Sequence, residues 1–280
     1  MLIFTRNAEI RSFLQAAKSD SKSIGFVPTM GALHKGHVSL IALSKKQCDI
    51  TICSIFVNPT QFNDPKDLER YPRMPEKDIL LLEKANCDVL FLPLVEEIYP
   101  SPKKEVFDFG YLNSTLEGKY RPGHFNGVAQ VVKRFFEIVN PTKAFFGSKD
   151  YQQVMIVKAL VQQMGSPIEI VPCPILRETD GLAMSSRNAL LNAEERSTAS
   201  SIPKMMVSAN ALIKTKGLNT AKSFIVDEVS KIQLMKLDYY EVCEAETLKI
   251  AENILPGKNY IAVIACFVGR IRLIDNLPVT

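Results

Sequence analysis

Two of the three histidines in the chain, His34 and His37, lie three positions apart within the segment Pro28–His37. The segment follows the apolar run Ile24–Val27 and precedes the amphipathic run Val38–Leu43, which predicts a strand, a glycine-containing turn and a helix start. Because a helix N-terminus presents unpaired N–H groups and a partial positive charge, this order indicates a phosphate site. The alternative is that both histidines only cap the helix.

The histidine pair suits adenylyl transfer. Attack on the α-phosphate of ATP spreads negative charge over the phosphoryl oxygens, and N–H donors aimed at those oxygens stabilise the transition state by roughly 3–4 kcal/mol each. On a helix, His34 and His37 would project to about the same side. Gly36 lies between them and would let a nucleotide approach the backbone.

Two further segments carry polar side chains just after an apolar run. Asn58 and Gln61 follow the first, and they could bind hydroxyl and carboxylate groups of a substrate or simply form a polar turn stiffened by Pro59. In the second, Lys149 could reach phosphates as a point charge, and Gln153 falls one helical turn later, so it could face the same cleft.

A fourth segment, Arg177–Asn188, contains a methionine, two serines and an arginine after Gly181. Met184, Ser185, Ser186 and Arg187 could wrap a triphosphate, or the segment could be a linker between domains.

The elements that must position these residues alternate along the first 175 residues. Strands are expected at Ile24–Pro28, Ile50–Val57, Val89–Leu92, Ala144–Phe146 and Ile168–Val171, and helices at His37–Lys46, Glu76–Ala85, Gly127–Val139 and Tyr151–Met164. Such alternation predicts an α/β fold, with a parallel sheet covered by helices on both faces. Sheets of this kind bind ligands at the carboxyl ends of their strands, and the loops 28–37, 58–73 and 147–153 follow such ends. Surface loops are expected at Tyr99–Lys104 and Glu117–Phe125, the latter as a flap.

The pattern changes after about residue 176. Helices are expected at Asn192–Lys216 and Thr220–Gln233, followed by strands at Asp238–Glu244, Tyr260–Val268 and Arg270–Asp275, the last two joined by a tight hairpin at Gly269. We therefore expect two domains, 1–176 with the parallel sheet and 177–280 as a smaller α+β domain with antiparallel strands.

The composition is that of an ordinary soluble globular protein, with 46% hydrophobic and 23% charged residues and a net charge of +4. No concentration of basic residues suggests nucleic-acid binding, and no run is apolar and long enough to span a membrane. With no signal-peptide core at the N-terminus, a cytoplasmic protein is expected. The six cysteines form no C-x-x-C pair and are expected to be buried as small hydrophobes.

Taken together, the four motifs closely resemble the pantothenate synthetase (pantoate–β-alanine ligase) family, and the likeness spans nearly the whole chain. The resemblance implies a Rossmann-like core of the H-x-G-H nucleotidyltransferase superfamily. It implies that ATP and (R)-pantoate give pantoyl adenylate and pyrophosphate, and that β-alanine then displaces AMP to give pantothenate for coenzyme A biosynthesis. It also implies Mg²⁺ accompanying the triphosphate, and a homodimer.

The resemblance assigns roles to individual residues. His37 would be the catalytic proton donor, with His34 and Lys149 also catalytic, and Gln61 would bind both pantoate and β-alanine, with Gln153 and Asn58 also at the substrate. ATP would be bound by Met30, Gly31, Ala32, Leu33, His34, Lys35, Gly36, His37, Gly147, Ser148, Lys149, Asp150, Leu176, Met184, Ser185, Ser186 and Arg187.

Three positions depart from the family pattern. Ser148 stands where Glu is usual, Lys35 replaces a commoner Glu and adds positive charge beside the phosphates, and Leu176 stands where Val is usual.

Three other functions compete with this one. An adenylyltransferase that makes a dinucleotide product would need an additional cationic site for a phosphorylated substrate and would lack the pair of amides Gln61 and Gln153. A tRNA synthetase would need an anticodon-binding extension. A nucleotide-binding module without turnover would not require paired histidines together with Lys149 and Arg187.

Overall fold

The computed structural model describes residues 1–101 and 105–279. The chain divides into two compact units, one made of Met1–Ser148 and Gln152–Pro174, the other of Lys149–Tyr151 and the chain from Ile175 onward. The division after Pro174 lies two residues before the boundary expected from the sequence. The three residues Lys149–Tyr151 group with the second unit although they lie within the sequence of the first.

The first unit is built on a six-stranded sheet in the order β1-β4-β3-β2-β5-β6, and all its strand pairs are parallel. This confirms the expected parallel sheet. The strands are β1 (Leu2–Phe4), β2 (Ile24–Thr29), β3 (Ile50–Ile55), β4 (Val89–Phe91), β5 (Lys143–Gly147) and β6 (Glu169–Cys173). The sequence did not predict β1, a three-residue strand at the edge of the sheet whose Leu2 and Ile3 are exposed.

Eight helices connect these strands within the described residues. They are α1 (Asn7–Ser19), α2 (Lys35–Gln47), α3 (Pro65–Arg70), α4 (Pro75–Lys84), α5 (Val95–Ile98), α6 (Leu116–Tyr120), α7 (His124–Val139) and α8 (Tyr151–Gln163). Short 3₁₀ turns lie at Pro59–Gln61, Gly110–Asn113 and Ser148–Asp150. The four helices predicted from the sequence are confirmed as α2, α4, α7 and α8.

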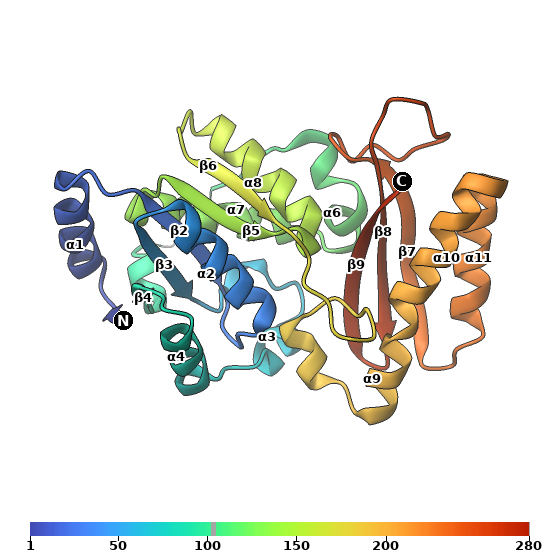
Figure 1. Cartoon of the computed structure of the whole chain (residues 1–280), viewed down its shortest axis with the longest axis horizontal. Coiled ribbons are helices and arrows are strands. Elements are labelled where there is room, and N and C mark those ends of the chain that lie inside the picture. The colour runs from blue at the N-terminus through green and yellow to red at the C-terminus, as the bar shows by residue number, and fades with distance from the viewer. Residues whose placement is uncertain (102–104, 280) are drawn as a thin grey trace. The chain divides into compact units, whose positions relative to one another are not determined.

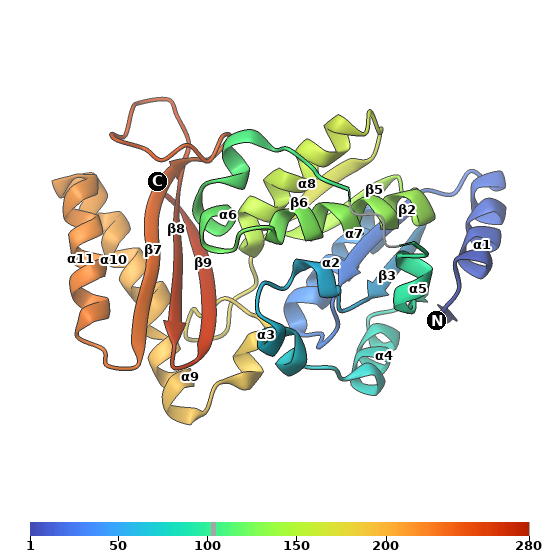
Figure 2. The same cartoon turned by 180° about the vertical axis from the view of Figure 1, so that it is seen from behind.

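Successive side chains of the strands point to opposite faces of the sheet, so each face has its own core. Phe26 and Ile52 pack on one face with residues of α1, α7 and α8, whereas their neighbours Val27 and Cys53 pack on the other with residues of α2 and α4. Figure 1 views the face covered by α2, and Figure 2 the face crossed by α7. Helices on both faces keep the sheet buried and leave the strand ends for ligands.

The strand order changes direction next to β2. From β2 the chain continues outward through β3 and β4, and it then returns to β5 on the other side of β2. In open α/β sheets, ligands bind outside the carboxyl ends of the strands where the order reverses. The loop after β2, which carries the histidine pair, therefore lies at the place where this fold binds ligands.

The second unit has a three-stranded antiparallel sheet in the order β7-β8-β9, formed by Met235–Glu244, Tyr260–Val268 and Ile271–Val279. Gly269, with φ of +56°, turns β8 into β9, which confirms the expected hairpin. The helices are α9 (Ala193–Ala199), α10 (Ser201–Lys216) and α11 (Leu218–Ser230), with a 3₁₀ turn at Ser186–Leu190. This α+β arrangement confirms the fold class expected for the C-terminal part.

Two predictions of local structure were wrong. The single helix expected over Asn192–Lys216 is divided into α9 and α10, and Pro203 lies in the first turn of α10, where its missing N–H breaks no helical hydrogen bond. The surface flap expected at Glu117–Phe125 is instead α6 and the start of α7, with Glu117 and His124 only 6% exposed. Gly118 explains this packing, because a Cβ there would lie 2.5 Å from the carbonyl oxygen of Asn113.

Of the loop expected at Tyr99–Lys104, residues 102–104 lie outside the described residues, and Tyr99 is half-buried. All six cysteines are free thiols, and all but the half-buried Cys48 are buried, which confirms the expected packing role.

Candidate active site

His34 and His37 cap the helix that they begin. His34 is the N-cap residue of α2, and its Nδ1 accepts a hydrogen bond from the backbone N–H of Gly36 at 3.1 Å. The backbone N–H of His34 donates in turn to Nδ1 of His37 at 3.2 Å. The ring centroids are 4.0 Å apart. The capping role and the adjacency expected for a phosphate site are therefore present in the same two side chains.

These hydrogen bonds also fix the tautomers of the two rings. A backbone N–H can only donate, so Nδ1 of each imidazole must accept, and in the neutral ring the proton is then on Nε2. Both neutral histidines thus carry their N–H donor on Nε2. Two N–H donors side by side at a helix start are suited to the oxygens of a phosphoryl group.

The loop between β2 and α2 is held by Asp78 of α4. Gly31 and Ala32 have φ of +80° and +49°, a left-handed turn that is unfavourable for alanine. The Asp78 carboxylate accepts hydrogen bonds from the backbone N–H groups of Ala32 at 2.8 Å and Leu33 at 2.7 Å. These two N–H groups are thus engaged with the carboxylate.

Asp78 is 2% exposed, and this burial raises the pKa of its carboxyl group, against the lowering effect of the two backbone hydrogen bonds. Sequence reasoning missed Asp78 because it lies 46 positions from Ala32. The space for a side chain at position 31 is also filled, since a Cβ on Gly31 would lie 3.0 Å from Oδ2 of Asp78.

The loop after β3 brings Gln61 beside the histidine loop. Gln61 Nε2 lies 2.8 Å from the sulfur of Met30, which precedes the turn at Gly31. Gln61 Oε1 accepts a hydrogen bond from Nδ2 of Asn58 at 3.1 Å. Asn58 is 1% exposed and its side chain is fully hydrogen-bonded within the protein, so the structure gives it a supporting place rather than an open one.

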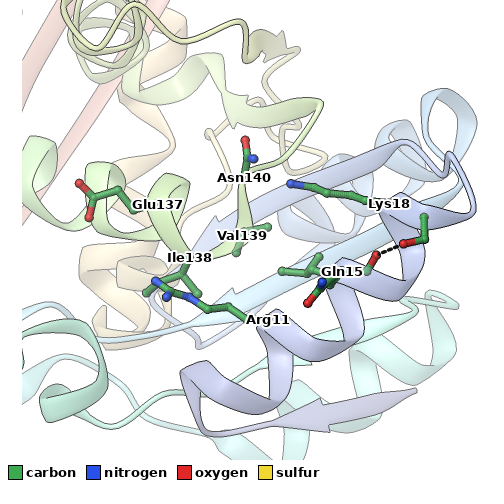
Figure 3. A pocket seen from close by; sticks show the side chains of 9 residues that line it. Arg11, Gln15, Lys18, Glu137, Ile138, Val139 and Asn140 are labelled. Carbon is green, nitrogen blue, oxygen red and sulfur yellow. Dashed lines mark hydrogen bonds between the residues drawn. The ribbon is translucent and has the colours of Figure 1, made fainter.

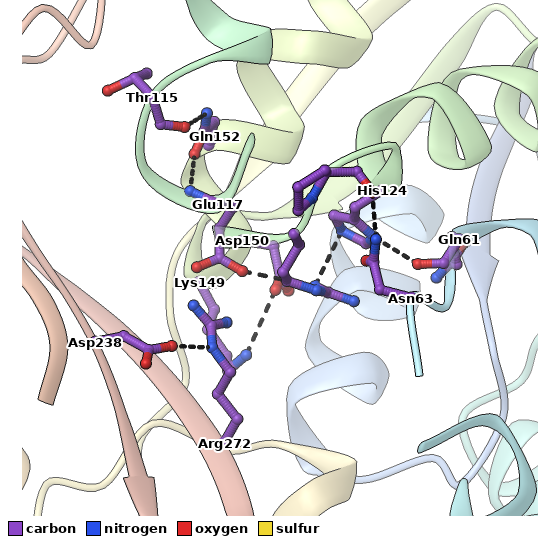
Figure 4. Close-up of polar contacts among 12 residues, drawn as sticks. Gln61, Asn63, Thr115, Glu117, His124, Lys149, Asp150, Gln152, Asp238 and Arg272 are labelled. Atoms are coloured by element: carbon purple, nitrogen blue, oxygen red, sulfur yellow. Dashed lines mark hydrogen bonds and ion pairs between the residues drawn. The ribbon is translucent and has the colours of Figure 1, made fainter. Parts of the chain in front are cut away.

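The third histidine, His124, lies against the backbone of Gln61. Its Nδ1 is 2.8 Å from the carbonyl oxygen of Gln61, and its Nε2 is 3.1 Å from Nη1 of Arg121. Arg121 is paired with the buried carboxylate of Glu117 at 3.6 Å. Figure 4 shows Glu117, His124 and Gln61 along this chain of contacts. The isolated histidine gave no motif in the sequence, and no signal there pointed to it.

The neighbouring glutamines of α8 have different surroundings. Gln152, also drawn in Figure 4, is buried and accepts from the backbone N–H of Glu117 at 2.9 Å while donating to the carbonyls of Leu112 and Thr115. Gln153, the one singled out from the sequence, is half-buried. Gln152 therefore supports α6.

The second predicted ATP segment begins at the end of β5. Gly147 is the last residue of β5, and Ser148 opens a 3₁₀ turn. Lys149 and Asp150 belong to the second unit, where Nδ2 of Asn276 donates to the carbonyl of Lys149 at 2.9 Å. The Lys149 ammonium lies 3.5 Å from the Asp150 carboxylate.

The third predicted ATP segment lies wholly in the second unit. The backbones of Leu176 and Met184 are joined by a hydrogen bond, which closes a short hairpin that turns at Gly181 with φ of +91°. Leu176 is 39% exposed. Ser185 caps the 3₁₀ turn that starts at Ser186, accepting from the backbone N–H of Arg187 at 3.3 Å.

Arg177 fixes this hairpin to β9. Its guanidinium forms two hydrogen bonds with the buried carboxylate of Asp275, at 2.7 and 2.9 Å, and donates to the carbonyls of Gly181 and Asn276 at 3.0 Å each.

The described residues contain no group of three or more histidines, cysteines, aspartates or glutamates that could hold a metal ion. None of the helices over residues 1–101 and 105–279 is long and apolar enough to cross a membrane. A surface hollow of about 550 Å³ lies between α1 and the end of α7 (Figure 3), lined by Arg11, Lys18 and Asn140 among others. It contains none of the predicted site residues.

Comparison with known proteins places these features in a family. The family model for pantoate-beta-alanine ligase matches residues 2–278. The chain is 44% identical over 277 residues to a pantothenate synthetase of Porphyromonas gingivalis, with 99% of each chain covered. It is 47% identical over 279 residues to a pantothenate synthetase of Christiangramia forsetii, again with 99% of each covered.

Solved structures agree. The pantothenate synthetase of Thermus thermophilus superimposes with a TM-score of 0.92 at 38% identity, covering 100% of this chain and 99% of that one. A pantoate-beta-alanine ligase of Francisella tularensis, solved as a complex with beta-gamma ATP and beta-alanine, gives a TM-score of 0.83 at 35% identity, covering 99% and 97%. The chain therefore belongs to the pantoate–β-alanine ligase (pantothenate synthetase) family.

Proposed function

We propose that this protein condenses pantoate with β-alanine at the expense of ATP, giving pantothenate, AMP and pyrophosphate. The observation that carries the proposal is the histidine pair at the start of α2. Its two rings carry Nε2–H donors at the point where the sheet order reverses, and the amide of Gln61 contacts Met30 of the same loop.

The reaction has two steps. The pantoate carboxylate attacks the α-phosphorus of ATP, and the bond to the β,γ-diphosphate breaks, so that pyrophosphate leaves and pantoyl adenylate forms. The deprotonated amine of β-alanine then attacks the acyl carbon, and AMP leaves with the electron pair of the acyl–oxygen bond. Neither step needs a nucleophile from the protein, so its residues contribute positioning and charge stabilisation.

The residues divide between these tasks. The Nε2–H groups of His34 and His37 stabilise the charge that develops on the phosphoryl oxygens, and His37 donates a hydrogen bond to the departing group, which leaves as the pyrophosphate anion. Gln61 and Gln153 bind pantoate through their amides, and Lys149 and Arg187 neutralise phosphate charge. The other predicted ATP contacts are Met30 to Leu33, Lys35, Gly36, Gly147, Ser148, Asp150, Leu176 and Met184 to Ser186.

Three properties belong to the same proposal. A magnesium ion would accompany the triphosphate and would be held largely by phosphates and water, because Mg²⁺ usually keeps several waters and binds through substrate phosphates. Its chemistry would be to neutralise triphosphate charge. A homodimer is carried over from the family resemblance, and the cytoplasmic location is the one expected from the sequence.

Isotope exchange between pyrophosphate and ATP tests the function. We expect exchange that requires pantoate and does not require β-alanine, because adenylation precedes the entry of the amine. Exchange in the absence of pantoate, or no exchange in its presence, would contradict the proposal. In a matched control, lactate replaces pantoate. Lactate offers a carboxylate and a hydroxyl without the rest of the substrate.

A further inference from the structure

Gln61 lies at the end of a series of side chains whose hydrogen bonds determine which end of its amide faces Asn58 and which end faces Met30. We propose that Tyr99 and Asn58 are positioning residues that hold the Gln61 amide with its nitrogen toward Met30 and the histidine loop, and that the substrate contacts this nitrogen. Gln61 then binds an oxygen acceptor, a carboxylate or a hydroxyl, and not an ammonium group. This inference rests on the proposed function and concerns the substrate site alone.

The orientation of Asn58 is set by two backbone groups. The N–H of Thr60 can only donate, and it lies 3.3 Å from Oδ1 of Asn58. The carbonyl of Gly127 can only accept, and it lies 3.1 Å from Nδ2 of Asn58. The Asn58 oxygen therefore faces Thr60 and its nitrogen faces Gly127, and the reversed amide would place like groups together at both ends.

Tyr99 reinforces this orientation. Its hydroxyl donates to Oδ1 of Asn58 at 2.8 Å, and the hydroxyl of Thr60 donates to the same oxygen at 3.0 Å. Burial raises the pKa of Tyr99, so the phenol remains protonated and remains a donor. Because Oδ1 of Asn58 receives three donors, the amide has one stable orientation.

The orientation of Gln61 follows from that of Asn58. The second N–H of Asn58 points to Gln61 at 3.1 Å, so the atom of Gln61 on that side must be its oxygen. The Gln61 nitrogen is then on the other side, where one of its two N–H groups meets the sulfur of Met30 at 2.8 Å. A nitrogen that only donates can bind a carboxylate or hydroxyl oxygen, whereas an ammonium would meet donor against donor.

This refines the role that the family resemblance gives to Gln61. Gln61 was expected to bind both pantoate and β-alanine, but the orientation restricts what it can contact on each. Pantoate offers a carboxylate and hydroxyls, which suit the nitrogen. β-Alanine can meet it only through its carboxylate, so the reacting amine must be bound by other groups.

Three variants test the inference, with KM for pantoate measured in pyrophosphate exchange and KM for β-alanine in the complete reaction. Gln61→Glu keeps the shape but replaces the donor by an acceptor, and it should raise KM for pantoate about 10- to 100-fold, the effect of losing a hydrogen bond to a charged group. KM for β-alanine should not fall. Tyr99→Phe should raise KM for pantoate about 3- to 10-fold, the effect of one neutral hydrogen bond, with KM for ATP unchanged. In the Gln61→Glu background, Tyr99→Phe should add nothing, because it acts through Gln61.

The matched control is Tyr240→Phe, which removes a buried tyrosine hydroxyl of the second unit that has no partner among the described residues. It should leave all three KM values unchanged. Wild-type protein without pantoate-dependent exchange would refute the proposed function. Three results with an active wild type would overturn this inference and leave the proposed function standing. The Gln61→Glu variant could keep the wild-type KM for pantoate, or it could gain affinity for β-alanine. Alternatively, Tyr99→Phe could have the same effect in the wild-type and Gln61→Glu backgrounds.

Discussion

Each histidine of the pair can perform two tasks through its two ring nitrogens, the capping of the helix seen in the structure and the proposed contact with the phosphoryl group. Nδ1 of each ring accepts a backbone N–H at the helix start, so the proton of the neutral ring is on Nε2, the nitrogen proposed to face the phosphoryl group. The structural and the catalytic interpretations of His34 and His37 are therefore compatible, and they concern different atoms. Substitutions can separate the two tasks, because another residue can supply the cap without supplying the second nitrogen.

His34→Asn and His34→Ala make this separation. Asparagine is a favourable N-cap residue, whereas alanine leaves the helix start uncapped at a cost of about 1 kcal/mol. Both variants lack the Nε2–H donor, so both should slow pyrophosphate exchange by about 10²- to 10³-fold. Only His34→Ala should also lower the unfolding temperature measured by circular dichroism. A His34→Asn variant with the wild-type exchange rate would show that His34 serves the helix alone.

At the scale of elements, the left-handed turn before α2 depends on α4. Asp78 accepts two consecutive N–H groups of that turn, so the position of the histidine loop is linked to a helix that begins more than forty residues later. The buried carboxylate carries a desolvation cost, seen in its raised pKa. Asp78 is thus a positioning residue for the loop.

Asp78→Asn should weaken ATP binding. The amide keeps one acceptor but places an NH₂ group against the second backbone N–H, so the loop loses a hydrogen bond worth about 1–3 kcal/mol. We expect the Kd for ATP, measured by calorimetry, to rise about 10-fold. Glu76→Gln is the control, because Glu76 lies in the same first turn of α4 but is exposed. If Asp78→Asn and Glu76→Gln bind ATP with equal affinity, Asp78 does not position the histidine loop for ATP.

The same variant has a predictable pH dependence. Because burial raises the pKa of Asp78 in the folded protein, its contribution to stability is present below the ordinary carboxyl pKa and is lost as pH rises through the folded pKa. The unfolding free energy of the wild type, relative to Asp78→Asn, should therefore increase as the pH is lowered from the folded pKa of Asp78 to the ordinary carboxyl pKa.

The elements that the sequence predicted well are those with local signals. The runs that became β2 to β6 are apolar and bounded by turn residues, and the histidine pair lies within four positions, so neither needs a distant contact to be recognised. Asp78 and Tyr99 could not be found in this way, because their partners lie about forty residues away. The prediction of a surface loop at Glu117–Phe125 was wrong for the same reason, since polar residues of this segment are buried by contacts with distant segments.

At the scale of the molecule, the described chain passes between its two units after Ser148, after Tyr151 and after Pro174. The second unit is therefore entered twice, at Lys149 and at Ile175. Hydrogen bonds tie each entering segment to β9, and the first also to Ala245, which follows β7. Asn276 binds the backbone of Lys149, and Tyr151 donates to the carbonyl of Ala245 at 2.9 Å. Arg177 binds Asp275, a carboxylate that is almost completely buried.

Arg177→Met should therefore destabilise the second unit. It removes the bidentate partner of Asp275, whose side chain is 2% exposed, and leaves a buried charge uncompensated at a cost of about 3 kcal/mol or more. The double variant Arg177→Met with Asp275→Asn should recover part of this loss, since the unpaired charge is gone.

Arg196→Met is the matched control, because the Arg196–Asp180 pair is about one-third exposed on both sides and should contribute less than about 1 kcal/mol. Urea unfolding followed by circular dichroism measures all three, as the chain has no tryptophan for fluorescence. If Arg177→Met and Arg196→Met unfold at the same urea concentration, the buried pair does not stabilise this unit. If only Arg177→Met unfolds early and the double variant partly recovers, the buried pair that joins the hairpin to β9 stabilises this unit.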